Sequence, residues 1–79
     1  MKILIMDSRN VRETIEIKGD DNIKNLKEKI KKKKGINKEI ILHYGGEILE
    51  EDQKVSDYDI QENNVIVYNG QFRGGTLYK

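Results

Sequence analysis

The sequence contains no cysteine, no proline and no tryptophan, and it has one histidine, His43. Without cysteine the chain can form neither disulfides nor thiolate metal sites. One histidine also supplies too few of the nitrogen ligands that zinc prefers. We therefore expect no metal ion and no cofactor, and a fold held together by an apolar core alone.

Long apolar runs and an excess of one charge are also absent. The first residues, MKILIMDSRN, alternate and then become polar, unlike the apolar stretch of a signal peptide, and no segment approaches a membrane span. The 15 basic and 14 acidic residues nearly cancel, whereas general nucleic-acid binders carry a basic excess. The 79 residues suffice for one small domain. We expect a monomer that binds neither membranes nor nucleic acids.

Period-two alternation of apolar residues predicts five short strands. Ile3 and Ile5 share one face of the first, and a polar four-residue link joins it to a second strand in which Val11, Ile15 and Ile17 share a face. The Gly45-Gly46 pair predicts a tight turn between the third and fourth strands. The predicted strands are Met1–Met6, Val11–Ile17, Glu39–Tyr44, Glu47–Leu49 and Val65–Tyr68.

One helix is predicted between the second and third strands. Ile23, Leu26 and Ile30 follow helical spacing and form one apolar stripe. Asn22 is a suitable N-cap and Gly35 a suitable C-terminal stop, so the helix should span residues 23–34. Residues 56–60 are predicted to form a turn or a single helical turn. The fold class is therefore α+β, with residues 1–69 as the domain and 70–79 as a flexible tail.

Three segments in this order resemble the ubiquitin family, including its Rub/Nedd-type modifiers. They are IKNLKEKIKKKKGI, SDYDIQENN and Arg73-Gly74-Gly75, with about one residue deleted near Lys38. The resemblance spans nearly the whole chain. It implies a β-grasp fold, a mixed sheet of four to five strands packed on one main helix in the order ββαββ(turn)β. It also implies a protein of the cytoplasm and nucleus that is not an enzyme.

The resemblance gives the paired glycines a function. In this family they end the mature protein, whose carboxyl is activated and joined to target lysines. It implies a processing protease that cuts between Gly75 and Thr76, followed by activating and conjugating enzymes and a ligase. Glycine suits this chemistry because a carboxyl without a neighbouring Cβ is little hindered. Arg73 adds a fixed positive charge beside it.

The family's usual binding patch is altered in this chain. By resemblance, its central isoleucine corresponds to His43, and its two flanking apolar positions correspond to Ser8 and Asn69. All three are polar, so we expect this partner surface to bind the usual receptors poorly. Either His43 is a solvent-facing strand residue without a role, or it contacts more polar partners with a sensitivity to pH. The family's basic residue on the same strand corresponds to Ile41.

Other positions bear on the branch of the family. Gln71 corresponds to a residue by which activating enzymes discriminate ubiquitin from Rub/Nedd-type proteins, and it matches neither. Together with the short extension after Gly75, it favours the Rub/Nedd-type branch. The two most used chain lysines correspond to Glu47 and Glu62, which cannot form isopeptides. Possible chain lysines remain in the helix, namely Lys27, Lys29 and Lys33, although they can equally be solvated charges.

Two other functions remain open. A ubiquitin-like domain can act as a non-covalent adaptor, for which the diglycine would be only a flexible end. A sulfur carrier shares the β-grasp fold and the diglycine, but usually stops at the glycines and lacks the SDYDIQ segment. An enzyme is disfavoured because the sequence pairs no nucleophile with a base and has no phosphate-binding loop.

Overall fold

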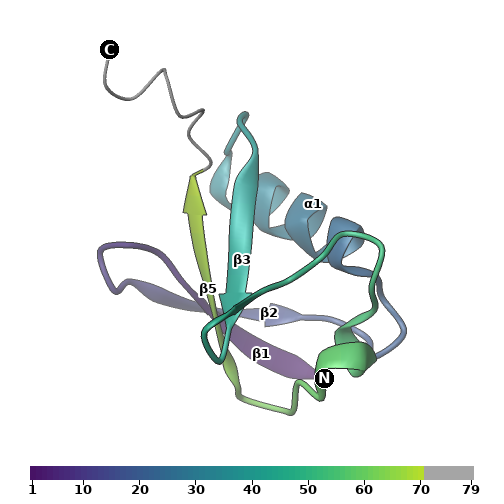
Figure 1. The fold of residues 1–79 in the computed structure, drawn as a ribbon. Coiled ribbons are helices and arrows are strands. Elements are labelled where there is room, and N and C mark those ends of the chain that lie inside the picture. Colours follow the sequence, from purple (N-terminus) through teal and green to yellow (C-terminus); the bar gives the residue numbers. More distant parts are fainter. Residues whose placement is uncertain (71–79) are drawn as a thin grey trace.

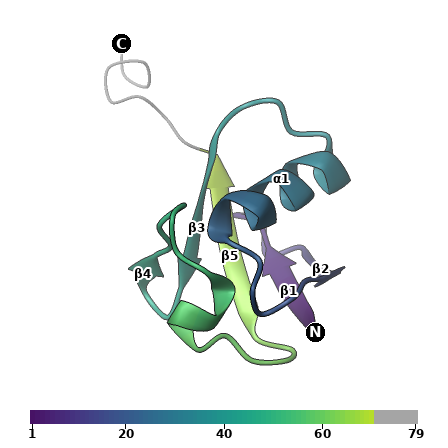
Figure 2. The ribbon, with the colours of Figure 1, turned by 90° about the vertical axis from the view of Figure 1, so that its right-hand side faces the viewer.

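A computed structural model of the protein describes residues 1–70, and residues 71–79 lie outside the described part. The described chain forms an α+β fold in which one helix packs against a mixed sheet (Figures 1 and 2). The strands are β1 (Lys2–Met6), β2 (Arg12–Glu16), β3 (Ile40–Tyr44), β4 (Glu47–Ile48) and β5 (Val65–Gly70); the helices are α1 (Ile23–Lys34) and the 3₁₀ helix η1 (Val55–Tyr58). This confirms the predicted fold class and element order.

The sheet has the order β2-β1-β5-β3-β4, so the last strand of the described chain lies at its centre. β1 and β5 are parallel and every other pair is antiparallel. Leu4 and Met6 of β1 lie beside Val65 and Val67 of β5. His43 of β3 also lies beside Val67, on its other side. This strand pairing determines which outward-facing residues lie next to each other.

Helix α1 begins and ends at the predicted residues. The Asn22 side chain accepts a hydrogen bond from the Asn25 N–H at 2.8 Å, which satisfies a donor left free in the first turn. Gly35 closes the helix in the left-handed conformation, with φ of 67°, and its N–H bonds to the Lys31 carbonyl. A residue with Cβ is disfavoured in that conformation. The buried stripe is the predicted one: Ile23, Leu26 and Ile30.

One core joins the helix to the inner face of the sheet. Its aliphatic members alternate along the strands as the period-two pattern predicts. The buried residues are Ile3, Ile5, Ile15, Ile17, Ile23, Leu26, Ile30, Ile40, Leu42, Leu49, Val55, Ile60, Ile66 and Tyr68. Among the described residues, no buried side-chain nitrogen or oxygen lacks a hydrogen-bond partner. The described part therefore folds around one apolar core, and no disulfide stabilises it because the sequence has no cysteine.

Six predicted strand ends are wrong by one or two residues: Met1, Ile17 and Glu39 lie just outside their strands, and the other three concern Val11, Leu49 and Gly70. Val11 is not on the buried face: β2 begins at Arg12, and Val11 belongs to the preceding turn, where it is 45% exposed and its N–H bonds to the Asp7 carboxylate. β4 ends at Ile48, although the Leu49 N–H still bonds to the Leu42 carbonyl. β5 continues to Gly70, which pairs with Ile40, so Gly70 belongs to the sheet and not to the predicted tail.

The residues after β4 are held against the start of α1. The Ile23 N–H bonds to the Gln53 carbonyl at 2.8 Å, and the Val55 N–H bonds to the Asp21 carbonyl at 2.9 Å. The Tyr58 hydroxyl accepts a hydrogen bond from the Glu50 N–H at 2.8 Å. These bonds fix the single turn η1, which the sequence predicted one residue later along the chain.

Candidate functional site

The outer face of the sheet, opposite α1, holds two of the three predicted partner-surface residues. Ile40 and Leu42 of β3 are buried, so Ile41 and His43, which alternate with them along the strand, face outward. Asn69 also faces outward and pairs with Ile41. Ser8 lies in the exposed turn between β1 and β2, and it lines a hollow together with Asn69. The structure therefore places Ser8 and Asn69 around one hollow, and His43 on the same face as Asn69, two positions further along the β3–β5 ladder.

This outer face is more apolar than the sequence predicted. Leu4 and Met6 of β1, Val65 and Val67 of β5, and Ile41 of β3 are all half-buried, outward-facing aliphatic residues. Ile48 of β4, which pairs with His43, is 54% exposed. The polar triad of Ser8, His43 and Asn69 is thus surrounded by aliphatic residues at other positions. Poor binding of the usual receptors at the three polar positions stays a prediction, and the aliphatic residues around them are an addition that the sequence analysis did not make.

The sequence analysis missed these aliphatic residues because it treated each strand separately. Their signal is present in the sequence: they occupy the positions that alternate with the buried ones. What brings them together is the parallel pairing of β1 with β5, two strands separated by most of the chain. A half-exposed aliphatic cluster of this kind is typical of a protein-binding surface.

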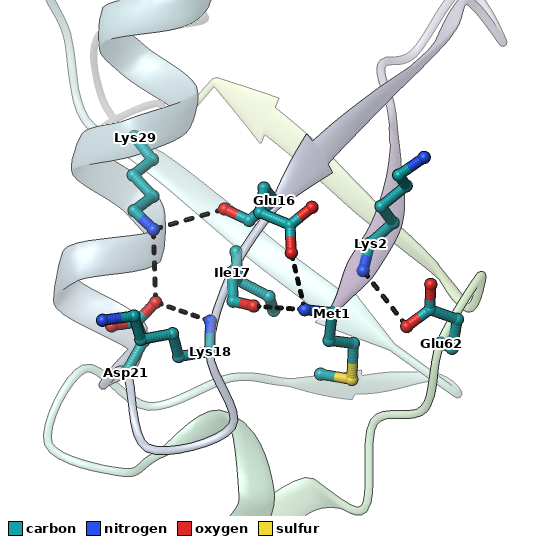
Figure 3. Close-up of polar contacts among 8 residues, drawn as sticks. All are labelled: Met1, Lys2, Glu16, Ile17, Lys18, Asp21, Lys29 and Glu62. Carbon is teal, nitrogen blue, oxygen red and sulfur yellow. Dashed lines mark hydrogen bonds and ion pairs between the residues drawn. The ribbon is translucent and has the colours of Figure 1, made fainter.

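The three candidate chain lysines differ in accessibility. The Lys27 side chain is only 12% exposed, and its Nζ lies 3.0 Å from Glu51 Oε2. Lys29 Nζ donates to the Glu16 carbonyl at 3.2 Å and to Asp21 Oδ2 at 3.3 Å (Figure 3). Lys33 is 41% exposed and lies 3.9 Å from Glu13 Oε1. Lys29 and Lys33 are exposed to a similar extent, 44% and 41%, with Lys33 making only the long contact to Glu13, and Lys27 is the least available of the three.

Lys29 belongs to a polar network around the N-terminus of the chain, which joins α1 to the segments that contain Met1 and Glu16 (Figure 3). The N-terminal ammonium donates to Glu16 Oε2 at 2.7 Å and to the Ile17 carbonyl at 2.9 Å. Hydrogen bonding from this ammonium holds the pKa of Glu16 below its usual 4.5. The pKa of Asp21 is also lowered, by the Lys18 N–H and then by Lys29, against the opposing effect of burial.

A second pair joins β2 to the end of α1. Glu13 accepts a hydrogen bond from Lys34, which lowers the pKa of Glu13 and raises that of Lys34. Lys33 adds the weaker contact described above. Lys33 and Lys34, at the C-terminal end of α1, therefore contact β2 instead of facing solvent freely.

Because these carboxylates have lowered pKa values, we expect acid to destabilise the fold. A carboxylate whose pKa is lower in the folded state stabilises it above its unfolded pKa, and this contribution is lost as pH falls through the folded pKa. With usual values of 4.5 for Glu16 and 3.8 for Asp21, the loss should begin near pH 4.5 and continue below 3.8. Thermal midpoints recorded between about pH 7 and pH 3 measure it.

Glu16→Gln provides the matched comparison for this experiment. It keeps the size of the side chain and removes the titrating group, so its midpoint should fall less steeply with acid than that of the wild type. Equal slopes for the two proteins would refute the role assigned to the Glu16 carboxylate.

The conjugation residues lie outside the described part of the chain. These are Gln71, Arg73, Gly74, Gly75 and Thr76. The described chain ends at Gly70, at the end of the central strand. Gly75 is the fifth residue after Gly70 in the sequence, and five residues of extended chain span at most about 18 Å.

Residues 1–70 contain neither a candidate metal site nor a helix that could span a membrane. No group of three His, Asp or Glu side chains there could hold a metal ion. No helix in that range is long and apolar enough to cross a membrane.

Comparison with known families agrees with this architecture. The family model described as "Ubiquitin family" matches residues 2–73, which include every strand and both helices. The helix on a mixed five-stranded sheet is the ubiquitin-like β-grasp fold. The match ends immediately before the diglycine and covers most of the 79 residues. The chain belongs to the ubiquitin family.

Proposed function

We propose that the protein is a ubiquitin-like modifier, attached to target lysines through the carboxyl of Gly75. One observation carries the proposal: a complete ubiquitin-family domain is followed, four residues after its last sheet residue Gly70, by the pair Gly74-Gly75. A domain that only binds partners through its folded surface does not need this pair. Processing by a protease would remove the four residues Thr76-Leu77-Tyr78-Lys79 and leave Gly75 as the terminus.

Within the family we favour the Rub/Nedd-type branch over ubiquitin itself. Gln71, which does not match ubiquitin at the position that activating enzymes discriminate, supports this choice. Glu47 and Glu62 stand where the most used chain lysines would be, and the Lys27 amine is nearly covered. Single attachment to targets is therefore favoured over chain formation. The proposal places the protein in the cytoplasm and nucleus, with a processing protease and activating and conjugating enzymes as partners.

The outer face of the sheet supports a second candidate function, a non-covalent adaptor domain. Its aliphatic residues, among them Met6, Ile41 and Val67, offer the desolvation energy on which protein recognition depends. A modifier needs such a face too, because its receptors must recognise it after conjugation. The face is therefore compatible with both functions, and only the tail discriminates between them.

The mass of the intact protein after incubation in lysate of the source cell tests the proposal. We expect loss of the four residues after Gly75, and Gly-Gly remnants on lysines of other proteins after tryptic digestion. An unchanged mass with no remnants would refute the modifier and leave the adaptor. The same protein with Gly75 replaced by Asp is the control for specific cleavage, since a general carboxypeptidase would shorten both chains.

A further inference from the structure

The lysines of α1 fall into two groups with different surroundings. Lys27, Lys29, Lys33 and Lys34 form ion pairs with acidic residues of neighbouring segments. Lys24, Lys31 and Lys32 form no ion pair within residues 1–70. Their spacing of i, i+7 and i+8 places them within about 100° of arc, on the side of the helix away from its buried stripe. The helix therefore presents a basic stripe of Lys24, Lys31 and Lys32, in which Lys24 and Lys32 are exposed and Lys31 is half-buried, and Glu28 lies within the same arc.

The opposite charge is concentrated in one other segment. Residues 47–62 contain seven acidic residues against one lysine, whereas α1 contains seven lysines against one glutamate. Four of these carboxylates line an open hollow of about 480 Å³ together with Gln53 and Tyr58, namely those of Glu47, Glu50, Asp57 and Asp59. None of the four forms an ion pair with a described residue.

Within one molecule the basic stripe meets the acidic segment at Glu51, whose pKa is lowered by Lys27 and further by Lys24 and Lys31. Glu51 does not line the acidic hollow, and none of the three stripe lysines forms an ion pair with the described carboxylates that line it. In both views the C-terminal half of α1 lies well away from η1 and the segment that follows β4 (Figures 1 and 2). Among the described residues, the ion pair between α1 and this segment is that of Lys27 with Glu51, in the N-terminal half of the helix. Lys31 and Lys32 flank a separate hollow at the helix end, which Ile36 also lines.

We propose that the basic stripe of α1 docks on the acidic hollow of a second copy of this chain. Lys31 and Lys32 of one copy would lie among the carboxylates of Glu47 and Glu50 of the next. Because the two surfaces differ, the contact is head-to-tail and can repeat along a row of copies. Lys32 and the four carboxylates of the hollow are exposed and Lys31 is half-buried, so the association is weak and is screened by salt. It requires neither the tail nor any enzyme and is therefore independent of the proposed function.

Two neutral double variants of the full chain test the contact. Lys31→Gln with Lys32→Gln removes the basic side, and Glu47→Gln with Glu50→Gln removes the acidic side. At about 1 mM protein and about 20 mM salt, the wild type should show a concentration-dependent rise in sedimentation mass, lost in about 300 mM salt where the screening length is below about 6 Å. Each variant alone should remain monomeric under the same conditions.

Mixing the two variants gives the decisive result. Each retains the side that the other lacks, so the equimolar mixture should form 1:1 dimers and no longer rows. The matched control, Lys2→Gln with Lys18→Gln, changes the net charge equally at exposed lysines away from the stripe and should associate like the wild type. A monomeric wild type at low salt, or association that persists in either variant alone, would overturn the proposal.

Discussion

Deleting Gly74 and Gly75 is expected to abolish conjugation completely while leaving the fold intact. The strand pairings among residues 1–70 do not involve the two glycines, so none of them is lost with the deletion. The deletion joins Arg73 to Thr76, so a reacting carboxyl would form at Arg73 only if the protease still cut before Thr76. The Cβ and long side chain of Arg73 would then have to enter a cleft suited to glycine. We expect conjugates to fall at least about 100-fold, because displacing a reacting group by about 1 Å can already cost that much.

A graded series makes this prediction sharper. Gly75→Ala adds one methyl group beside the reacting carboxyl and should slow conjugation by about 10-fold to 100-fold. A chain that stops at Gly75 should conjugate at the wild-type level even when the processing protease is inhibited. The readout is the amount of slower-migrating conjugates of a tagged chain in source-cell lysate with ATP. Conjugates that persist in the deletion variant would show that attachment does not use Gly75.

Local signals made the helix predictable from the sequence. Asn22, the three-residue apolar stripe and Gly35 all lie within one short segment, and each acts on its immediate neighbours. Helix caps and helical periodicity are local properties, so they need no knowledge of the rest of the chain. The buried faces of the strands were predictable for the same reason, as Ile3, Ile5 and Ile66 show.

Strand ends and the outer face depended on distant partners. Gly70 has little strand propensity, yet it pairs with Ile40 because β3 supplies a partner as far as that residue. The alternation predicted that Val11 is buried, but its N–H donates a hydrogen bond to the Asp7 carboxylate, which holds Val11 in the turn before β2. The neighbours of His43 follow from the β3–β5 ladder, which joins residues far apart in the sequence. Register between distant strands is the information that one sequence did not supply.

The outer face and the lysines together define what a partner of this protein can use. A receptor that docks on the sheet meets aliphatic residues around His43, not at His43 itself. An enzyme that modifies the helix meets Lys24 and Lys32 as exposed amines without ion pairs among the described residues, whereas Lys27 is covered. Polar replacements at three positions therefore change which partners can bind, without removing the capacity of the face to bind proteins.

The core should be the most sensitive part of the protein, and Leu26→Ala is expected to destabilise it by about 3–4 kcal/mol. The Leu26 side chain is fully buried in the centre of the α1 stripe, between Ile23 and Ile30. Truncation removes its buried methyl groups and leaves a cavity that a sheet and a helix cannot easily close. A domain of this size is stable by roughly 5–10 kcal/mol, so the loss is a large fraction of the total.

Chemical denaturation of the wild type and three variants measures this effect. In thermal unfolding, Leu26→Ala should lower the midpoint by about 12–32 °C, given about 4–8 °C per kcal/mol for small domains. Leu26→Met keeps the volume and should cost less than about 1.5 kcal/mol. Asn25→Ala makes the same change to alanine one residue away on the exposed face, and should stay within about 0.5 kcal/mol of the wild type. A cost below about 1 kcal/mol for Leu26→Ala would mean that the helix is not packed on the sheet as the structure has it, because a fully buried leucine cannot be removed so cheaply from a close-packed core.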